Sequence, residues 1–235
     1  MKKAMIAAIM AVVIGFVGAL GLCVRVLTGA QAVAMFADGG MRIVLDAGHG
    51  GIDVGVTGKT TKVKESELNL AIVMQLKEKL TDMGFTVTLT RKTDAGLYGA
   101  ATKGFKKRDM QRRKEIIEET NPLLVISVHQ NFYPSSAYRG AQVFYSKNNA
   151  NSERLALATQ TQLNDLYAET GAKHRQALEA EYYILQCSTY PTVIVECGFL
   201  SNAKDEELLQ TLGWQRRLSE GIAAGIMTYL SNVTA

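Results

Sequence analysis

The chain has 235 residues, of which 47% are hydrophobic and 20% are charged, and its formal net charge is +4. This composition is typical of an ordered globular protein and excludes a disordered or fibrous chain. The first 35 residues hold three of the 26 basic residues and none of the 22 acidic ones, which leaves 23 basic and 22 acidic residues in the remainder. Because that balance is nearly neutral, no nucleic-acid partner is expected.

An uncharged apolar run stands near the beginning of the chain. It extends from Ala4 to Val24, two lysines precede it, and Arg25 follows it. A helix of this length reaches about 31 Å, close to the thickness of a bilayer core. Two interpretations fit: a signal peptide cleaved among the small residues 30–34, or an uncleaved membrane anchor. In both cases the lysines predict a cytoplasmic N-terminus and an exported domain, at the outer face of the cytoplasmic membrane or in the cell wall.

The remainder of the chain alternates between strand and helix patterns. Residues 1–40 are interpreted as the membrane or signal segment with a linker, and residues 41–235 as one folded domain. The expected strands are 42–46, 85–89, 123–128, 141–145, 182–185 and 192–195. The expected helices extend from about 67 to a stop at Gly84, over 106–120, over 152–167 and over 214–230, with a long loop at 93–107. We therefore expect an α/β fold with a largely parallel twisted sheet and helices on both of its faces.

Polar side chains follow three of the expected strands, at the edge of the sheet where sites of open α/β folds collect. His49 follows the first strand, His129 ends the strand 123–128, and Glu196 ends the strand 192–195. A further carboxylate, Glu65, stands just before the first helix. Two histidines and one glutamate are a common ligand set for catalytic zinc, which keeps one position open for water.

Other interpretations of single residues stay open at this point. A histidine in a glycine-rich turn is often structural, and a glutamate before a helix often only favours the helix dipole. Cys197 is a rival nucleophile, although no histidine is near it in the sequence. A Cys187–Cys197 bridge is conceivable in an exported protein, but two buried free thiols are the favoured interpretation. His174 is interpreted as a surface residue, while Asp46 and Asn131 are candidate supports for the histidines.

Six segments occur in a characteristic order between about Arg42 and Leu230: VLDAGHGGIDVGVTG, ESELNL, TR, ISVHQN, GAQVFY and VECGFLSN. Together they resemble the zinc-dependent N-acetylmuramoyl-L-alanine amidases. The resemblance implies a peptidoglycan hydrolase that cuts the amide between N-acetylmuramic acid and the L-alanine of the stem peptide, with residues 41–235 as its catalytic domain.

The resemblance also implies roles for four residues. His49, Glu65 and His129 match the ligands of Zn²⁺, and Glu196 matches the family's catalytic glutamate, which moves protons during hydrolysis. Glu65 is preferred to Glu67 as the ligand because the family's ligand lies four residues before the asparagine of the NL pair.

Within the family, the segment RGAQVFY and the lysine-containing loop before Arg112 are similar to the sporulation-specific amidases of spore cortex and germination. This similarity implies the first step towards muramic-δ-lactam, in the intermembrane space of the forespore, with the N-terminal segment in the membrane. Because some members need a lipoprotein, such a partner is a candidate. A vegetative cell-wall amidase and a zinc peptidase acting on the stem peptide are the alternatives. The retention of all four residues argues against a membrane-anchored binding module with an inactive site.

Overall fold

The computed structural model describes residues 41–233. The segment 1–40, with its expected anchor or signal sequence, lies outside the described residues, so the domain boundary after residue 40 stays a prediction. Among the described helices, none combines the length and apolar character that a membrane span requires.

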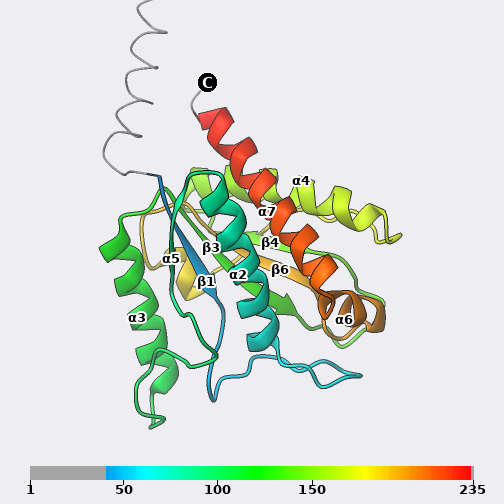
Figure 1. Ribbon diagram of the computed structural model, residues 1–235, viewed down its shortest axis with the longest axis horizontal. Helices are drawn as coiled ribbons and strands as arrows, with labels where there is room; N and C mark the ends of the chain where they lie inside the picture. Colours follow the sequence, from blue (N-terminus) through cyan, green and yellow to red (C-terminus); the bar gives the residue numbers. More distant parts are fainter. Residues whose placement is uncertain (1–40, 234–235) are drawn as a thin grey trace, which may run out of the picture. The chain divides into compact units, whose positions relative to one another are not determined.

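Six strands form one sheet in the order β2-β1-β3-β6-β4-β5 (Figure 1). Their bounds are β1 Arg42–Ala47, β2 Thr86–Leu89, β3 Leu124–Asn131, β4 Gln142–Tyr145, β5 Leu178–Glu179 and β6 Thr192–Phe199. The pairs β1–β2, β1–β3, β3–β6 and β4–β5 are parallel, and only β4–β6 is antiparallel. The expected largely parallel sheet is thus confirmed.

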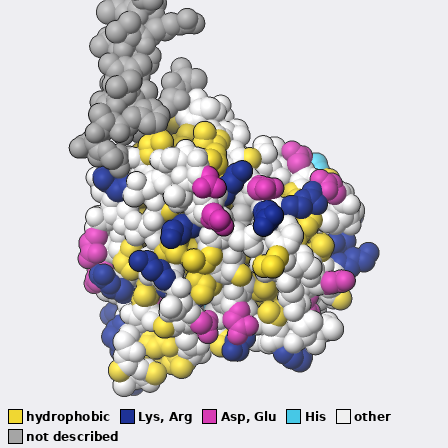
Figure 2. All heavy atoms as spheres, in the orientation of Figure 1, with side chains coloured by type: hydrophobic (Ala, Val, Ile, Leu, Met, Phe, Trp, Pro, Cys, Tyr) yellow, Lys and Arg dark blue, Asp and Glu magenta, His cyan; other side chains and the backbone are white. Residues whose placement is uncertain are grey.

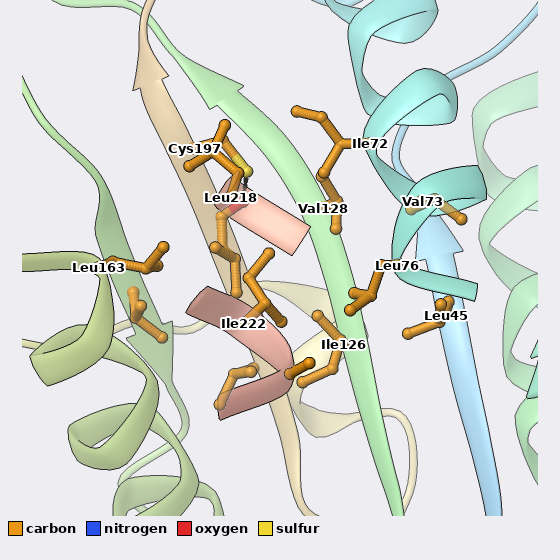
Figure 3. Close-up of a cluster of buried hydrophobic side chains, with 14 of the residues drawn as sticks. Leu45, Ile72, Val73, Leu76, Ile126, Val128, Leu163, Cys197, Leu218 and Ile222 are labelled. Atoms are coloured by element: carbon orange, nitrogen blue, oxygen red, sulfur yellow. Dashed lines mark hydrogen bonds between the residues drawn. The ribbon is translucent and has the colours of Figure 1, made fainter. Parts of the chain in front are cut away.

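Helices cover both faces of this sheet, as expected. Their bounds are α2 Glu65–Asp82, α3 Phe105–Thr120, α4 Ala150–Ala168, α5 Tyr183–Gln186, α6 Ala203–Leu209 and α7 Leu212–Val233. Helices α2, α4 and α7 bury the larger apolar core on one face, and α3 and α5 cover the smaller one on the other (Figure 1). In Figure 3, Ile72 and Leu76 of α2 point towards the strands, because their spacing of four residues places them on one face of the helix. Leu218 of α7 packs into the same core.

The expected strand at 182–185 is wrong, because this segment forms the single helical turn α5. A short apolar run cannot be assigned by periodicity alone. The edge of β4 is already paired with β5, and the chain crosses the sheet face on its way to β6. One helical turn places the consecutive residues Ile184 and Leu185 against that face together, whereas a strand would turn them to opposite sides.

Helix α6 was missed by the sequence pattern because it has only seven residues. Its N-terminus nevertheless carries a local signal. Asn202 accepts hydrogen bonds from the backbone N–H groups of Lys204 and Asp205, and an acidic side chain follows three residues later. The helix lies beside the end of β6, near the edge of the sheet where the candidate site is found.

Candidate metal centre and active site

Three of the residues selected from the sequence meet at the carboxyl edge of the sheet. His49 comes from the loop after β1, His129 from β3, and Glu65 is the first residue of α2. Each offers one ligand atom, and these atoms all lie within 4.8 Å of one another. Oε1 of Glu65 is 2.8 Å from Nδ1 of His129 and 3.3 Å from Nε2 of His49. The arrangement can therefore hold a metal ion with two imidazole nitrogens and one carboxylate oxygen.

Glycine at two positions makes this close approach possible. A Cβ atom at Gly48 would lie 2.2 Å from the ring of His129, and one at Gly55 would lie 2.4 Å from Oε2 of Glu65. Gly55 also has a φ of +70°, a backbone conformation that residues other than glycine rarely adopt. The glycine-rich segment after β1 is thus required for the chain to pass between the candidate ligands.

Two buried arginines hold the backbone that carries His49. Arg91 donates to the carbonyl oxygens of Ala47 and Gly48, at 2.8 and 3.0 Å. Arg113 of α3 donates to the carbonyl oxygens of Ala47 and His49, at 2.9 and 2.7 Å. His49 itself has a φ of +63°, a conformation uncommon for a residue with a side chain. The guanidinium groups therefore stabilise a backbone conformation that local preferences disfavour.

The imidazole of His49 is oriented by Asp53, a residue that the sequence reasoning did not select. Oδ2 of Asp53 lies 3.1 Å from Nδ1 of His49, and Nζ of Lys106 lies 3.3 Å from the other oxygen of Asp53. This contact directs Nε2 of His49 towards Glu65, as outer-shell carboxylates do for metal-binding histidines. The only sequence signal was an aspartate within the GHGGID segment.

The two supports proposed from the sequence have other roles. Asp46 contacts neither histidine; it accepts hydrogen bonds from Thr90 and Ser127, at 2.7 and 2.6 Å, and forms a buried ion pair with Arg113. It is linked to the His49 backbone through Arg113, which donates to the carbonyl oxygen of His49. The side-chain oxygen of Asn131 accepts from the adjacent backbone N–H of Phe132, which shapes the end of β3.

Glu65 is buried and surrounded by donors. Its Oε2 accepts from the backbone N–H of Val56 at 2.8 Å, and Oε1 accepts from the backbone N–H of Gln130 at 3.1 Å. Burial by itself would raise the pKa of Glu65, but hydrogen bonds from His129 and His49 outweigh it and lower that pKa far below its usual range. Glu67 instead pairs with Lys64 on the surface, so the helix turns only the first of the two glutamates into the site.

Glu196 stands beside the three candidate ligands. It is in register with His129 on the neighbouring strand β6. Burial raises the pKa of Glu196 to about 7, and its Oε2 is buried with no hydrogen-bond partner among residues 41–233. A buried carboxyl oxygen without a partner, next to ligand atoms for a metal, fits a group that exchanges protons with bound water or substrate.

Cys197 has the geometry of a core residue. Its side chain points away from the site, into the apolar core beside Leu218 (Figure 3), and it is fully buried. Burial raises the pKa of its thiol far above the usual range, which opposes formation of the thiolate that a nucleophile requires. Cys187 and Cys197 are both free, and His174 is exposed, as expected.

The fold and the site together define a class: an α/β enzyme domain whose sheet edge carries a histidine–glutamate–histidine group that can hold a metal, with a buried glutamate beside it. A family model described as N-acetylmuramoyl-L-alanine amidase matches residues 43–228, and the chain belongs to this family. The expected enzyme class is thereby confirmed.

Individual relatives agree with this assignment. The chain is 33% identical to the germination-specific N-acetylmuramoyl-L-alanine amidase of Bacillus subtilis, over 82% of this chain and 81% of that protein. The amidase LytC of the same organism is 30% identical over 81% of this chain, which corresponds to 36% of LytC. Among solved structures, the CwlD amidase of Clostridioides difficile in complex with the GerS lipoprotein superposes with a TM-score of 0.77 and 37% identity, over 81% of this chain and 98% of that chain.

Proposed function

We propose that this amidase uses one zinc ion held by His49, Glu65 and His129, with Glu196 as the catalytic acid and base. The observation that carries the proposal is the convergence of the three ligand atoms within 4.8 Å, beside a glutamate whose pKa is raised to about 7. The donor set of two nitrogens and one carboxylate oxygen fits zinc, and three protein ligands leave a coordination position open.

The chain's own residues account for the remaining steps of amide hydrolysis. Bound zinc supplies the Lewis acidity that activates the amide carbonyl and the attacking water. Glu196 takes the proton of that water at its unpaired Oε2 and transfers it to the nitrogen of the leaving L-alanine. Glu65 stays ionised and anchors both histidines, and Asp53 fixes the orientation of His49.

Metal analysis tests the ligand assignment. His49→Ala, Glu65→Ala and His129→Ala proteins are expected to lose most of their zinc, since each removes one of three ligands. Glu67→Ala is the matched control, because Glu67 lies two residues from Glu65 but pairs with Lys64 on the surface. A Glu67→Ala protein without zinc, alongside a zinc-loaded Glu65→Ala protein, would reverse the assignment.

The biological substrate proposed is spore-cortex peptidoglycan, where removal of the stem peptide is the first step towards muramic-δ-lactam. Support comes from the similarity to the germination-specific amidase and to CwlD. Because the substrate is exported, the domain would act outside the cytoplasm. A lipoprotein partner is proposed from the CwlD complex, and attachment to the membrane from the apolar run 4–24, which lies outside the described residues.

Mass spectrometry of digested peptidoglycan tests this function. An amidase releases intact stem peptides with a free L-alanine amine and leaves the glycan strand whole. A zinc peptidase would release fragments cut within the stem, which would contradict the proposal. Activity on cortex compared with activity on vegetative wall separates a sporulation amidase from a vegetative one. For a sporulation amidase, a deletion strain is expected to lose muramic-δ-lactam from its cortex.

A further inference from the structure

Two adjoining hollows near α6 are rich in cationic side chains. One lies between the hairpin 57–64 and the loop after β3 and includes Lys59, Arg139 and Lys204 in its lining. The other shares Arg139 with it and includes Lys173 and Arg175. No aspartate or glutamate lines either hollow. We call the two together the cationic hollow.

The lysines of the cationic hollow are not neutralised by the protein. Lys59, Lys173 and Lys204 are exposed, and none of them forms an ion pair within residues 41–233. On the face of the molecule that Figure 2 shows, basic and acidic side chains are interspersed. Since residues 36–235 are nearly balanced in charge, this local excess of positive charge is not a consequence of overall composition.

The arginines of the hollow are held in place by other residues. Arg139 donates to Asp205 at 3.1 Å and to Thr170. Arg175 donates to the carbonyl oxygen of Arg139 at 2.8 Å, and its guanidinium lies over the ring of Phe199, 4.7 Å from the centroid. Arg139 is ion-paired with Asp205, so the positive charge that remains unpaired within residues 41–233 lies on Arg175 and on the exposed lysines at the rim.

Backbone hydrogen bonds connect the hollow to the active site. The N–H of Lys59 donates to the carbonyl oxygen of Leu200 at 3.0 Å, and the N–H of Leu200 donates to that of Asn131 at 2.8 Å, two residues beyond His129. Glu206 of α6 fixes the hairpin 57–64 by accepting from the N–H groups of Thr60 and Thr61.

The hollow lies near the metal centre, because Lys59 belongs to the hairpin that leads into Glu65. Lys59 precedes Glu65 by six residues, so the two backbones are at most about 20 Å apart. A stem peptide of roughly five residues reaches about 17 Å when extended.

A pocket towards α3, whose lining includes His49 and His129, has a different charge character. The pocket towards α3 contains Asp46, Asp53 and Asp109, and its two cations are already paired: Arg113 with Asp46 and Asp109, and Lys106 with Asp53. It offers no free cation to a carboxylate, so an anionic peptide is directed away from it and towards α6.

We propose that the cationic hollow is a subsite for the carboxylates of the stem peptide, with Lys59 and Lys204 as its specificity-determining residues. This inference rests on the proposed function. It assigns a direction to the substrate: the peptide extends from the metal centre towards α6. Free carboxylates on the peptide, and above all its C-terminal carboxylate, are the groups recognised.

The test uses two muramoyl peptides that differ only in a free or an amidated C-terminus of the stem. The wild type is expected to show a KM about threefold to tenfold lower for the free acid, with kcat unchanged, because two exposed lysine–carboxylate pairs each contribute modestly. In the Lys59→Ala/Lys204→Ala protein this preference is expected to disappear. Lys204→Glu is expected to reverse it, since repulsion replaces attraction.

Lys79→Ala is the matched control, because Lys79 is an exposed lysine on α2, 14 residues and about 21 Å along the helix from Glu65. A preference that persists in the folded Lys59→Ala/Lys204→Ala protein, or that is lost equally in Lys79→Ala, overturns the subsite while leaving amidase activity intact. If the wild type releases stem peptide from neither substrate, the proposed function fails and the subsite with it. Weakened binding of an acidic wall polymer, with the stem preference unchanged, also counts against the peptide subsite.

Discussion

At the scale of single residues, two glutamates at the site differ in ionisation because their surroundings differ. Burial opposes the charge of both. Glu65 overcomes it through hydrogen bonds from His129 and His49, which lower its pKa, whereas Glu196 has no hydrogen bond at Oε2 and its pKa rises to about 7. One group is thus suited to hold a cation, and the other to exchange a proton near neutral pH.

Glu196→Gln is expected to retain zinc and lose activity. Glutamine keeps the shape of the side chain but cannot accept the proton of water, so hydrolysis should fall by on the order of 10²–10⁴. Zinc content by metal analysis and peptide release by mass spectrometry are measured on the same preparation. A folded, zinc-loaded Glu196→Gln protein with a normal rate would falsify the catalytic role.

Cys197→Ser serves as the companion control for this measurement. The thiol lies in the core on the far side of β6 and has no access to the site. We expect the variant to stay active, with some loss of stability from a hydroxyl placed among apolar side chains. Complete loss of activity in a folded Cys197→Ser protein would revive the thiol mechanism.

Asp53→Asn is expected to weaken metal binding without removing a ligand. The substitution replaces the carboxylate that contacts Nδ1 of His49, so the orientation of the imidazole is less well fixed. A loss of about 10–100-fold in zinc affinity is expected, measured by competition with a chelator. Asp82→Asn, at an exposed position at the end of α2, should bind as the wild type does. Equal affinities of the two variants would contradict an orienting role for Asp53.

At the scale of elements, a buried ion pair joins α3 to the sheet. Arg113 of α3 and Asp46 of β1 are both almost completely buried, and Ser127 of β3 donates to the same carboxylate. Burial would raise the pKa of Asp46, but Arg113 and the hydrogen bonds from Ser127 and Thr90 outweigh it and lower the pKa to about 2. This network places α3 against the loop that carries His49.

The contribution of Asp46 to stability is expected to depend on pH. Because its pKa falls on folding from 3.8 to about 2, the stabilisation is complete above about pH 4 and is lost as the pH falls towards 2. The difference in free energy of unfolding between wild type and Asp46→Asn should shrink by about 2 kcal/mol over that window. Urea unfolding at several pH values measures it, with Asp82→Asn as the control. A difference that is constant with pH contradicts the pairing.

At the scale of the whole molecule, the candidate metal centre joins parts of the domain that are distant in sequence. The ligand candidates come from the loop after β1, from the start of α2 and from β3, and Glu196 comes from β6. Parallel pairing of β1, β3 and β6 brings their carboxyl ends to one edge. A metal bound there would favour the folded state over the unfolded chain.

Zinc is therefore expected to raise the melting temperature. Free zinc at about 100 times its dissociation constant adds about 2.7 kcal/mol, which corresponds to roughly 5–10 °C for a domain of this size. Thermal unfolding of chelated and zinc-loaded protein measures the shift, and Glu65→Ala should show little of it. An unchanged melting temperature in the zinc-loaded wild type would contradict zinc binding at this centre of the folded domain.

The sequence by itself determined the positions of most strands and helices and the α/β class. Helical spacing such as Leu68, Ile72 and Leu76 reports burial of one face, which is a local property. The order of the six motifs likewise indicated the family, and two of these motifs carry His49 and His129.

Only the tertiary structure decided which distant groups touch. The segment Tyr183–Gln186 forms a helical turn, which packs Ile184 and Leu185 together against the smaller core. Asp46 contacts Arg113 of α3 and neither histidine, and Cys197 points into the core. The cationic hollow likewise combines lysines separated by more than a hundred residues. Such contacts depend on strand order and on the direction of each side chain, which spacing along the chain does not encode.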